Sequence, residues 1–188
     1  MSKIITITGD LGSGKSTISN ILCKKLGFEY VYTGMIHRKI AERLGMNAFE
    51  LNKYAEEHPE IDDEIDSTFK TLDKDNKNYI VDSRLAWFFI ENSFKIYLRT
   101  NLTVAAKRIF NDSKRFNEKY KTEKDALKTI IQRKKSEDKR YFKKYKADCS
   151  NMNNFDLLLD TSFLTPEQIA DFIIEKYEKW KKESNTKI

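Results

Sequence analysis

A short stretch near the N-terminus, Gly9 to Thr17, has the residue types and spacing of a phosphate-binding loop. It reads Gly-Asp-Leu-Gly-Ser-Gly-Lys-Ser-Thr and fits the pattern G-x-x-x-x-G-K-[ST]. The glycines allow successive backbone N–H groups to turn inward as a nest for phosphate oxygens. In this pattern Lys15 reaches the β- and γ-phosphates and the Ser16 hydroxyl binds Mg²⁺. The loop therefore predicts binding of a nucleoside triphosphate. We expect the contacts from the whole stretch: Gly9, Asp10, Leu11, Gly12, Ser13, Gly14, Lys15, Ser16 and Thr17.

The segments on either side of the loop support this interpretation. Residues 3–8 are rich in β-branched side chains, as a buried strand would be. Residues 17–26 follow with apolar side chains at helical spacing. Strand, glycine-rich turn and helix form the structural context in which this short pattern acts as a phosphate site.

Asp82 is the second candidate for the same chemistry, because it ends the apolar segment 78–82. In phosphate-loop enzymes an acid at a strand end binds Mg²⁺, directly or through water, beside the loop hydroxyl. The alternative is that Asp82 and Ser83 cap the helical stretch that follows. We favour the metal-associated role.

Several arginines have positions suited to a second phosphate group. Arg38 and Arg84 each follow an expected strand end, where open α/β sheets present ligand groups. Arg133 and Arg140 are two helical turns apart on one face, with Glu137 between them. Such pairs can simply support a surface helix, but arginine also suits bidentate phosphate contact. Together with the loop, the arginines indicate a site for two phosphorylated molecules.

Length and composition favour one domain of 188 residues with no apolar run long enough to cross a membrane. The chain enters its first strand at once, and Cys23 and Cys149 have neither metal-ligand nor disulfide-framework spacing. We therefore expect a cytoplasmic protein. The net charge is +6, but residues 107–146 contain 16 basic and 6 acidic side chains, a local charge of +10. This basic segment fits a phosphate clamp, a nucleic-acid surface or a solvated lysine-rich face.

The remaining pattern alternates strands with helices and predicts an α/β fold with a five-stranded parallel sheet. Polar helices are expected over residues 35–75, interrupted at Gly45 and Pro59, and a long helix from a Thr122 cap to about residue 145. The predicted strands are 3–8, 28–32, 78–82, 94–99 and 155–160.

These motifs, with others along the chain, resemble the nucleoside monophosphate kinases, and in particular the short cytidylate kinases typical of archaea and some bacteria. The likeness runs from about residue 3 to residue 175. The segments that carry it, besides the phosphate loop, are Thr-Gly-Met-Ile-His-Arg at 33–38, Leu-Asn-Lys-Tyr-Ala-Glu-Glu-His-Pro-Glu-Ile-Asp at 51–62, Val-Asp-Ser-Arg-Leu-Ala at 81–86, Ala-Lys-Arg-Ile at 106–109, 133–141 and Asp-Thr-Ser at 160–162.

The resemblance implies transfer of a phosphoryl group from MgATP to CMP or dCMP, with the preference among CMP, dCMP and UMP left open. We expect no nucleic-acid partner, and a monomer, because two segments of such a kinase must move. By similarity, Gly34, Arg38 and Arg84 bind the acceptor, and Glu137 approaches its ribose. Arg108 begins a mobile lid whose tip spans about residues 111–122 and includes Arg115. Lys15, Arg108, Arg133 and Arg140 form the catalytic set. Residues 34–75 are the moving acceptor segment of a single domain, residues 1–188.

Two features depart from the family pattern. Asp10 stands where relatives commonly have proline, and its acid would oppose triphosphate binding unless it points away. The stretch Arg133-Lys134-Lys135-Ser136-Glu137-Asp138-Lys139-Arg140 lacks the first acid of the long-form pattern Arg-Asp-x-x-Asp-x-x-Arg and has Glu for the second.

Other functions stay open at this point. Adenylate, dephospho-coenzyme A and shikimate kinases are alternatives on the same fold, although Asp82-Ser83-Arg84 lacks the Asp-Gly-[Phe/Tyr]-Pro-Arg run expected of an adenylate kinase. A nucleotide-regulated RNA-binding protein that uses residues 107–146 is an alternative of a different class.

Overall fold

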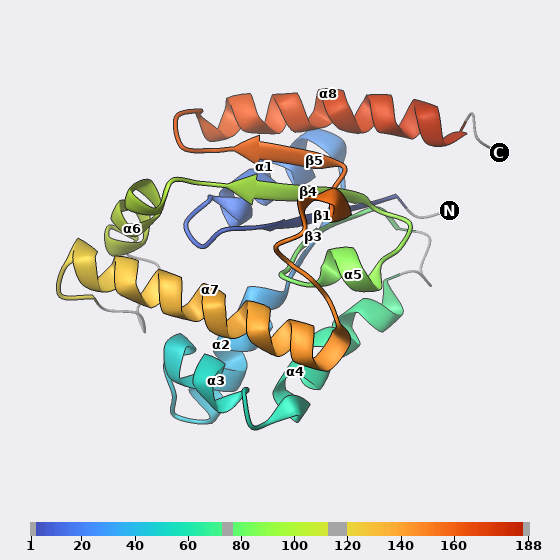
Figure 1. Cartoon of the computed structure of the whole chain (residues 1–188). Coiled ribbons are helices and arrows are strands. Elements are labelled where there is room, and N and C mark those ends of the chain that lie inside the picture. Colours follow the sequence, from blue (N-terminus) through green and yellow to red (C-terminus); the bar gives the residue numbers. More distant parts are fainter. Residues whose placement is uncertain (1–2, 73–76, 113–119, 186–188) are drawn as a thin grey trace.

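The computed structural model describes residues 3–72, 77–112 and 120–185. Its centre is a five-stranded parallel sheet in the order β2-β3-β1-β4-β5 (Figure 1). The predicted parallel α/β fold is confirmed, and each strand lies within two residues of its predicted bounds. The strands are β1 (Ile4–Gly9), β2 (Glu29–Tyr32), β3 (Tyr79–Asp82), β4 (Phe94–Arg99) and β5 (Leu157–Asp160).

The central strand carries the phosphate loop at its carboxyl end. Every residue of β1 is buried, as expected for a strand covered on both faces. It pairs with β3 on one side, with Ile7 opposite Asp82, and with β4 on the other. This register brings Asp82 and the start of the loop to the same edge of the sheet.

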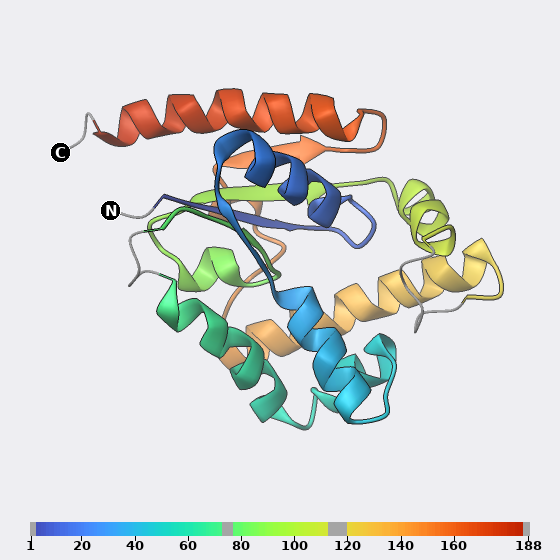
Figure 2. The same cartoon turned by 180° about the vertical axis from the view of Figure 1, so that it is seen from behind.

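Helices cover both faces of the sheet (Figures 1 and 2). On one face, α1 (Lys15–Leu26) and α8 (Pro166–Asn185) pack against β1 and β4 through a core that includes Ile5, Leu22, Ile96 and Ile173. On the other face lies the short α5 (Ala86–Phe89), whose Trp87 shares a buried cluster with Tyr97 and Phe155. Tyr141 of the long helix α7 (Glu123–Tyr145) packs against this cluster. Two 3-10 turns, η1 (Ser67–Thr71) and η2 (Met152–Asn154), complete the connections.

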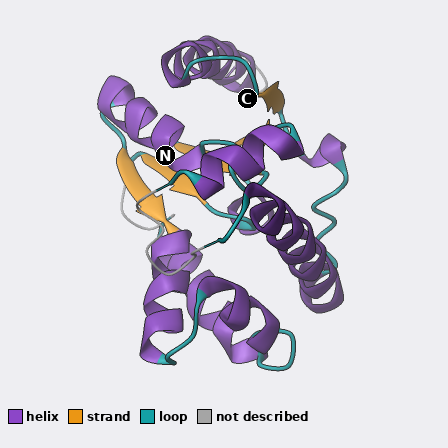
Figure 3. Ribbon diagram, turned by 90° about the vertical axis from the view of Figure 1, so that its left-hand side faces the viewer, coloured by secondary structure: helices purple, strands orange, loops and turns teal. Residues whose placement is uncertain are grey.

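Three helices form a separate small layer below the sheet, on the side away from α8 (Figure 3). They are α2 (Thr33–Arg43), α3 (Ala48–Tyr54) and α4 (Pro59–Asp66), with a core of their own around Ile40, Leu51 and Ile61. The expected interruptions at Gly45 and Pro59 are confirmed, because α2 ends before Gly45 and α4 begins at Pro59. This layer corresponds to the predicted acceptor segment, whose movement stays a prediction.

The predicted helix caps are present where the chain turns toward the site. Asn101 caps α6 (Leu102–Phe110) by accepting a hydrogen bond from the backbone N–H of Thr103, and the Thr122 hydroxyl accepts one from Asp125 at the start of α7. At α8, Thr165 and Gln168 exchange reciprocal hydrogen bonds. The middle of the predicted lid tip, residues 113–119 with Arg115, lies outside the described residues.

Both cysteines are free thiols: Cys23 packs against the main core and Cys149 is buried. Burial raises the pKa of the Cys23 thiol to about 11, as expected for an unreactive core position. Among the described residues, none of the helices combines the length and apolar character required to span a bilayer.

Candidate active site

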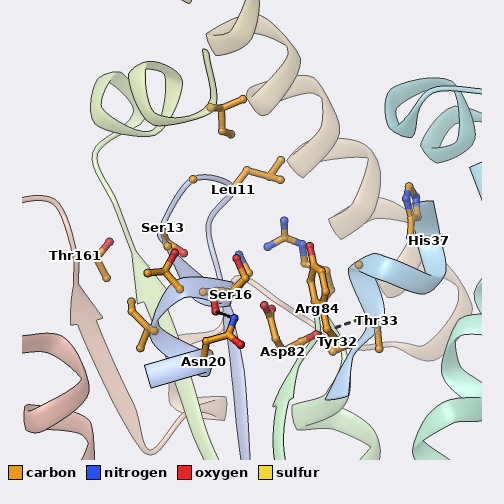
Figure 4. Close-up of a pocket in the computed structure, with 18 of the residues that line it drawn as sticks. Leu11, Ser13, Ser16, Asn20, Tyr32, Thr33, His37, Asp82, Arg84 and Thr161 are labelled. Atoms are coloured by element: carbon orange, nitrogen blue, oxygen red, sulfur yellow. Dashed lines mark hydrogen bonds between the residues drawn. The ribbon is translucent and has the colours of Figure 1, made fainter. Parts of the chain in front are cut away.

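A cavity of about 940 Å³ runs between the edge of the sheet and the small helical layer. The phosphate loop and the beginning of α1 form one wall, and residues of α2, α4 and α7 form the other. Figure 4 shows Ser16, Asp82 and Arg84 at the sheet edge, with Thr161 beyond the loop and His37 on the side of α2. The structure therefore brings most of the predicted residues into one continuous cavity.

The loop glycines have a packing role in addition to the predicted approach to phosphate. Gly9 and Gly12 have φ angles of 148° and 78°. A Cβ on Gly9 would lie 2.2 Å from the carbonyl oxygen of Leu98, and one on Gly12 would lie 2.9 Å from the Cα of Ala105. Side chains at either position would collide with backbone, so glycine is required for the loop to sit against β4 and α6.

Lys15 lies folded against its own loop. Its Nζ donates hydrogen bonds to the carbonyl oxygens of Gly9 (3.0 Å) and Asp10 (2.8 Å). Burial, with the nearby Arg84 guanidinium adding to it, lowers the pKa of Lys15 to about 7. An anion in the cavity would reverse this shift, because negative charge favours the ammonium form.

Asp10 is turned away from the cavity. Its Oδ1 accepts a hydrogen bond from the Tyr97 hydroxyl (2.8 Å), and its Oδ2 accepts one from the backbone N–H of Thr100 (3.1 Å). Lys134 of α7 lies 3.6 Å from the same carboxylate. The acid that departs from the family pattern therefore does not face the cavity. Asp10 instead connects the loop to the end of β4 and to α7, on the side of the loop away from the cavity.

Ser16 and Asp82 lie on the wall where β1 and β3 end (Figure 4). Asp82 is buried, and burial raises the pKa of its carboxyl group even though Lys15 and Arg84 favour the charged form. The Tyr30 hydroxyl donates to its Oδ2 (3.2 Å), a partner that the sequence pattern gave no means of identifying. One hydroxyl and one carboxylate match the few protein ligands that Mg²⁺ takes beside substrate phosphates.

Arg84 and Arg133 meet at the carboxylate of Glu137. The Nε of Arg84 lies 3.0 Å from Oε2, and the Nε of Arg133 lies 2.9 Å from Oε1. Arg84 also donates to the carbonyl oxygen of Gly9. Burial alone would raise the pKa of Glu137, but Arg84, Arg133 and Arg140 lower it to about 2. The structure thus gives Glu137 the position of a bridge between two arginines.

Arg140 lies on the same cavity wall but faces the small helical layer. Its Nε donates to Oδ2 of Asp62 (2.8 Å), and its Nη1 donates to the carbonyl and side-chain oxygens of Asn52 (3.1 and 3.2 Å). In this conformation Arg140 therefore joins α7 to α3 and α4. Asp62 and Asn52 were not predicted as site residues, although both lie in the segment that carries the family resemblance.

Arg38 and Gly34 lie at the start of α2. The Arg38 guanidinium stacks 5.0 Å above the Tyr32 ring and lines the cavity. A Cβ on Gly34 would lie 2.6 Å from that same ring. Gly34 thus leaves the space in which Tyr32 supports Arg38.

Arg108 connects the phosphate loop to the turn between β5 and α8. It donates to the carbonyl oxygen of Gly12 (3.2 Å) and to the carbonyl oxygen of Thr161 (2.7 Å). Leu164 and Pro166 line the adjoining part of the cavity. The region combines a guanidinium with apolar side chains at the end of the cavity away from α4.

Comparison with known proteins agrees with this geometry. The chain matches the cytidylate kinase-like family over residues 4–163. It is 38% identical over 172 residues to the cytidylate kinase of Sulfolobus acidocaldarius, a match that covers 90% of this chain and 91% of that one. It is 37% identical over 185 residues to the cytidylate kinase of Methanocaldococcus jannaschii, covering 95% and 99%.

Two further similarities concern part of a longer protein and a solved structure. A match of 36% identity over 180 residues covers 95% of this chain but 37% of an S-adenosylmethionine-dependent nucleotide dehydratase from Lacinutrix mariniflava. Among solved structures, the shikimate kinase of Acinetobacter baumannii has the same fold, with a TM-score of 0.59, 15% identity and coverage of 93% and 92%. The phosphate loop, the facing arginines and the extent of these matches lead to one conclusion: the chain belongs to the cytidylate kinase-like family.

Proposed function

We propose that this protein transfers the γ-phosphoryl group of ATP to CMP or dCMP. The observation that carries the proposal is one continuous cavity in which the phosphate loop faces a second cationic group, Arg38, Arg84 and Arg133. Membership of the cytidylate kinase-like family and the named relatives support CMP as the acceptor.

The chemistry asked of the protein is mainly alignment and charge neutralisation. An oxygen of the acceptor phosphate forms a bond to the γ-phosphorus while the bond to the β-phosphate oxygen breaks, and ADP leaves with that electron pair. Both nucleotides are anionic, so Lys15, Arg84 and Arg133 are placed to oppose their repulsion and the charge of the transition state. Ser16 and Asp82 would hold Mg²⁺, which supplies further positive charge at the phosphates when bound.

The other candidate residues divide between the two nucleotides. The loop from Gly9 to Thr17 and Arg108 serve ATP, with Asp10 contributing backbone rather than its carboxylate. Gly34 and Arg38 serve the acceptor phosphate. We propose that Glu137 holds Arg84 and Arg133 in position for the phosphate groups. Arg140 would approach the acceptor only if the layer formed by α2, α3 and α4 moves.

Closure of that layer and of the lid would exclude water, which would otherwise accept the phosphoryl group. The described part of the lid, at the end of α6 and the beginning of α7, borders the ATP side. A monomer suits these movements.

The test is ADP release from MgATP with CMP, dCMP, UMP, AMP, GMP, dephospho-coenzyme A and shikimate as acceptors. We expect fast turnover with CMP and dCMP and loss of turnover in Lys15→Ala, with its fold retained by circular dichroism. Turnover confined to another acceptor would overturn the proposal that CMP or dCMP is the acceptor. If folded protein binds ATP but uses no acceptor, and binds RNA in a salt-sensitive way, the RNA-binding alternative holds instead.

A further inference from the structure

Two carboxylates of α4, Asp62 and Asp66, line the end of the cavity nearest the small helical layer. They are four residues apart and therefore lie on one helix face. Asp62 is 1% exposed, so its carboxylate has almost no contact with bulk water. Ile65 and Ala48 line the same region and supply apolar surface beside the two acids.

Each carboxylate is held from α7 through one oxygen. Arg140 donates to Oδ2 of Asp62 (2.8 Å), and the Tyr145 hydroxyl donates to Oδ2 of Asp66 (2.5 Å). From the parts of the chain that the structure describes, neither Oδ1 receives a hydrogen bond. Attachment of α4 to α7 therefore uses one of the two oxygens of each carboxylate.

The position of the carboxylates along α7 indicates what they face. Arg133 and Glu137 mark the turn of α7 beside Arg84, where the acceptor phosphate is proposed to bind. Arg140 and Tyr145 lie three and eight residues beyond Glu137, or about 4.5 and 12 Å along the helix axis at 1.5 Å per residue. An acceptor whose phosphate binds beside Arg84 and whose base extends along α7 toward its C-terminus would therefore present its base to these carboxylates.

A buried acid beside a half-buried one is unfavourable in a site for an anionic ligand unless the ligand presents a donor to them. The 4-amino group of cytosine is such a donor, and a carboxylate is a suitable acceptor for it. Uracil has an oxygen at the same position, which would face the acids lone pair to lone pair.

We propose that Asp62 and Asp66 determine the acceptor base, by accepting hydrogen bonds from the exocyclic amino group of cytosine and excluding uracil. This inference rests on the proposed phosphoryl transfer to a cytidine nucleotide. Arg140 then has a positioning role, because it fixes the carboxylate of Asp62. Discrimination arises because a bound uracil would leave buried polar groups unpaired.

The experiment measures kcat/KM for CMP and for UMP in the wild type and in Asp62→Asn and Asp66→Asn. An amide in place of either acid can donate a hydrogen bond to the uracil oxygen. We therefore expect the ratio of kcat/KM for CMP to kcat/KM for UMP to fall at least tenfold in each variant, mainly through changes in KM. The matched control is Asp63→Asn, which removes an acid of the same helix whose side chain is 66% exposed and paired with Lys144. We expect that control to keep the wild-type ratio.

Three results would overturn the inference. The wild type could have equal kcat/KM for CMP and UMP, or both variants could keep a CMP-to-UMP ratio of kcat/KM within threefold of the wild-type ratio. The third is a fall of this ratio in Asp63→Asn as large as the fall in the two variants. If Asp62→Asn does not fold because Arg140 loses its partner, Asp66→Asn decides alone. Failure of the proposed function looks different, since then the wild type would phosphorylate neither CMP nor UMP.

Discussion

Arg84, on the turn that follows β3, and Glu137, in the middle of α7, form an ion pair across the cavity with Nε 3.0 Å from Oε2. Arg133 binds the other carboxylate oxygen at 2.9 Å. The sheet edge and the long helix are therefore joined through one acid, which holds two guanidinium groups in place. Charge that is positioned in advance stabilises a transition state without reorganisation during the reaction.

Replacing Glu137 by Gln should reduce both stability and activity. The lowered pKa of Glu137, about 2, means that its contribution to stability is complete above the pKa of the unfolded chain, 4.5, and is lost as the pH falls toward 2. We expect the variant to lose on the order of 3 kcal/mol of unfolding free energy at pH 7. Denaturant titration at pH 7 and pH 3 measures this, and the difference from wild type should shrink at pH 3.

The activity of Glu137→Gln shows whether Glu137 positions Arg84 and Arg133, apart from its contribution to the stability of the fold. Loose arginines should lower kcat/KM by about 100-fold at a temperature where the variant is folded. Glu183→Gln, which removes an exposed acid of α8, is the matched control and should change neither property. Wild-type kcat/KM in Glu137→Gln would show that the bridge does not prepare the arginines.

Much of the fold could be predicted because local signals agreed with one another. Asn101, Thr122 and the Thr165–Gln168 pair each mark the start of a helix through hydrogen bonds between residues near in sequence. The β-branched run before the loop marks a strand through its residue types alone. The phosphate loop could be recognised in the same way, because its whole pattern lies within Gly9 to Thr17. Such signals need no knowledge of the tertiary structure.

The partners within the site depend on long-range packing and could not be predicted in the same way. Glu137 was expected near a ribose, but only the structure brings Arg84 to it from 53 residues earlier in the chain. Asp62 reaches Arg140 because α4 packs beside α7. Asp10 turns outward because Tyr97 and the backbone of Thr100 stand behind the loop. No spacing pattern records these contacts.

Asp10→Ala should weaken ATP binding rather than strengthen it. The variant removes the acceptor of the Tyr97 hydroxyl and of the Thr100 N–H, so the loop loses its attachment to β4. We expect the Kd for MgATP to rise about tenfold, a loss of about 1.4 kcal/mol, the size expected for hydrogen bonds to a charged group. Calorimetric titration measures it. Tighter ATP binding in the variant would mean that Asp10 repels the triphosphate.

Arg133→Ala should lose mainly activity, whereas Arg140→Ala should lose mainly stability. Removing Arg133 takes away a group proposed to contact the phosphoryl group, so kcat should fall by 100-fold or more while the protein stays folded. Removing Arg140 leaves the buried acid Asp62 without its cation, so unfolding free energy should fall by about 3–5 kcal/mol. The KM for the acceptor should rise as well. Steady-state kinetics and denaturant titration of both variants give the comparison. A matching loss of kcat without loss of stability in Arg140→Ala would place that arginine at the phosphoryl group instead.

ATP binding should be accompanied by proton uptake at Lys15. With a pKa of about 7, much of the free lysine is neutral at pH 8, and the triphosphate favours its charged form. We expect uptake approaching one proton at pH 8 and little at pH 6, measured by calorimetry in buffers of different ionisation enthalpy. Lys15→Arg is the control, because arginine stays charged and should show no uptake. Equal uptake in this variant would assign the proton to another group.

Base selection should weaken in mild acid if Asp66 faces the base. Burial raises the pKa of Asp66 to about 6, although the Tyr145 hydroxyl and the Lys144 ammonium favour its charged form; Asp62 and Asp63 add to the increase. Above pH 6 the carboxylate accepts a hydrogen bond from cytosine, and below it the protonated acid can donate one to uracil. The ratio of kcat/KM for CMP to that for UMP should therefore fall as the pH is lowered from 8 to 5.5. Titration of the acceptor phosphate and of Lys15 affects both substrates alike and cancels in the ratio. Asp66→Asn should have a ratio that is low at every pH, and a wild-type ratio that stays constant over this range would place Asp66 away from the base.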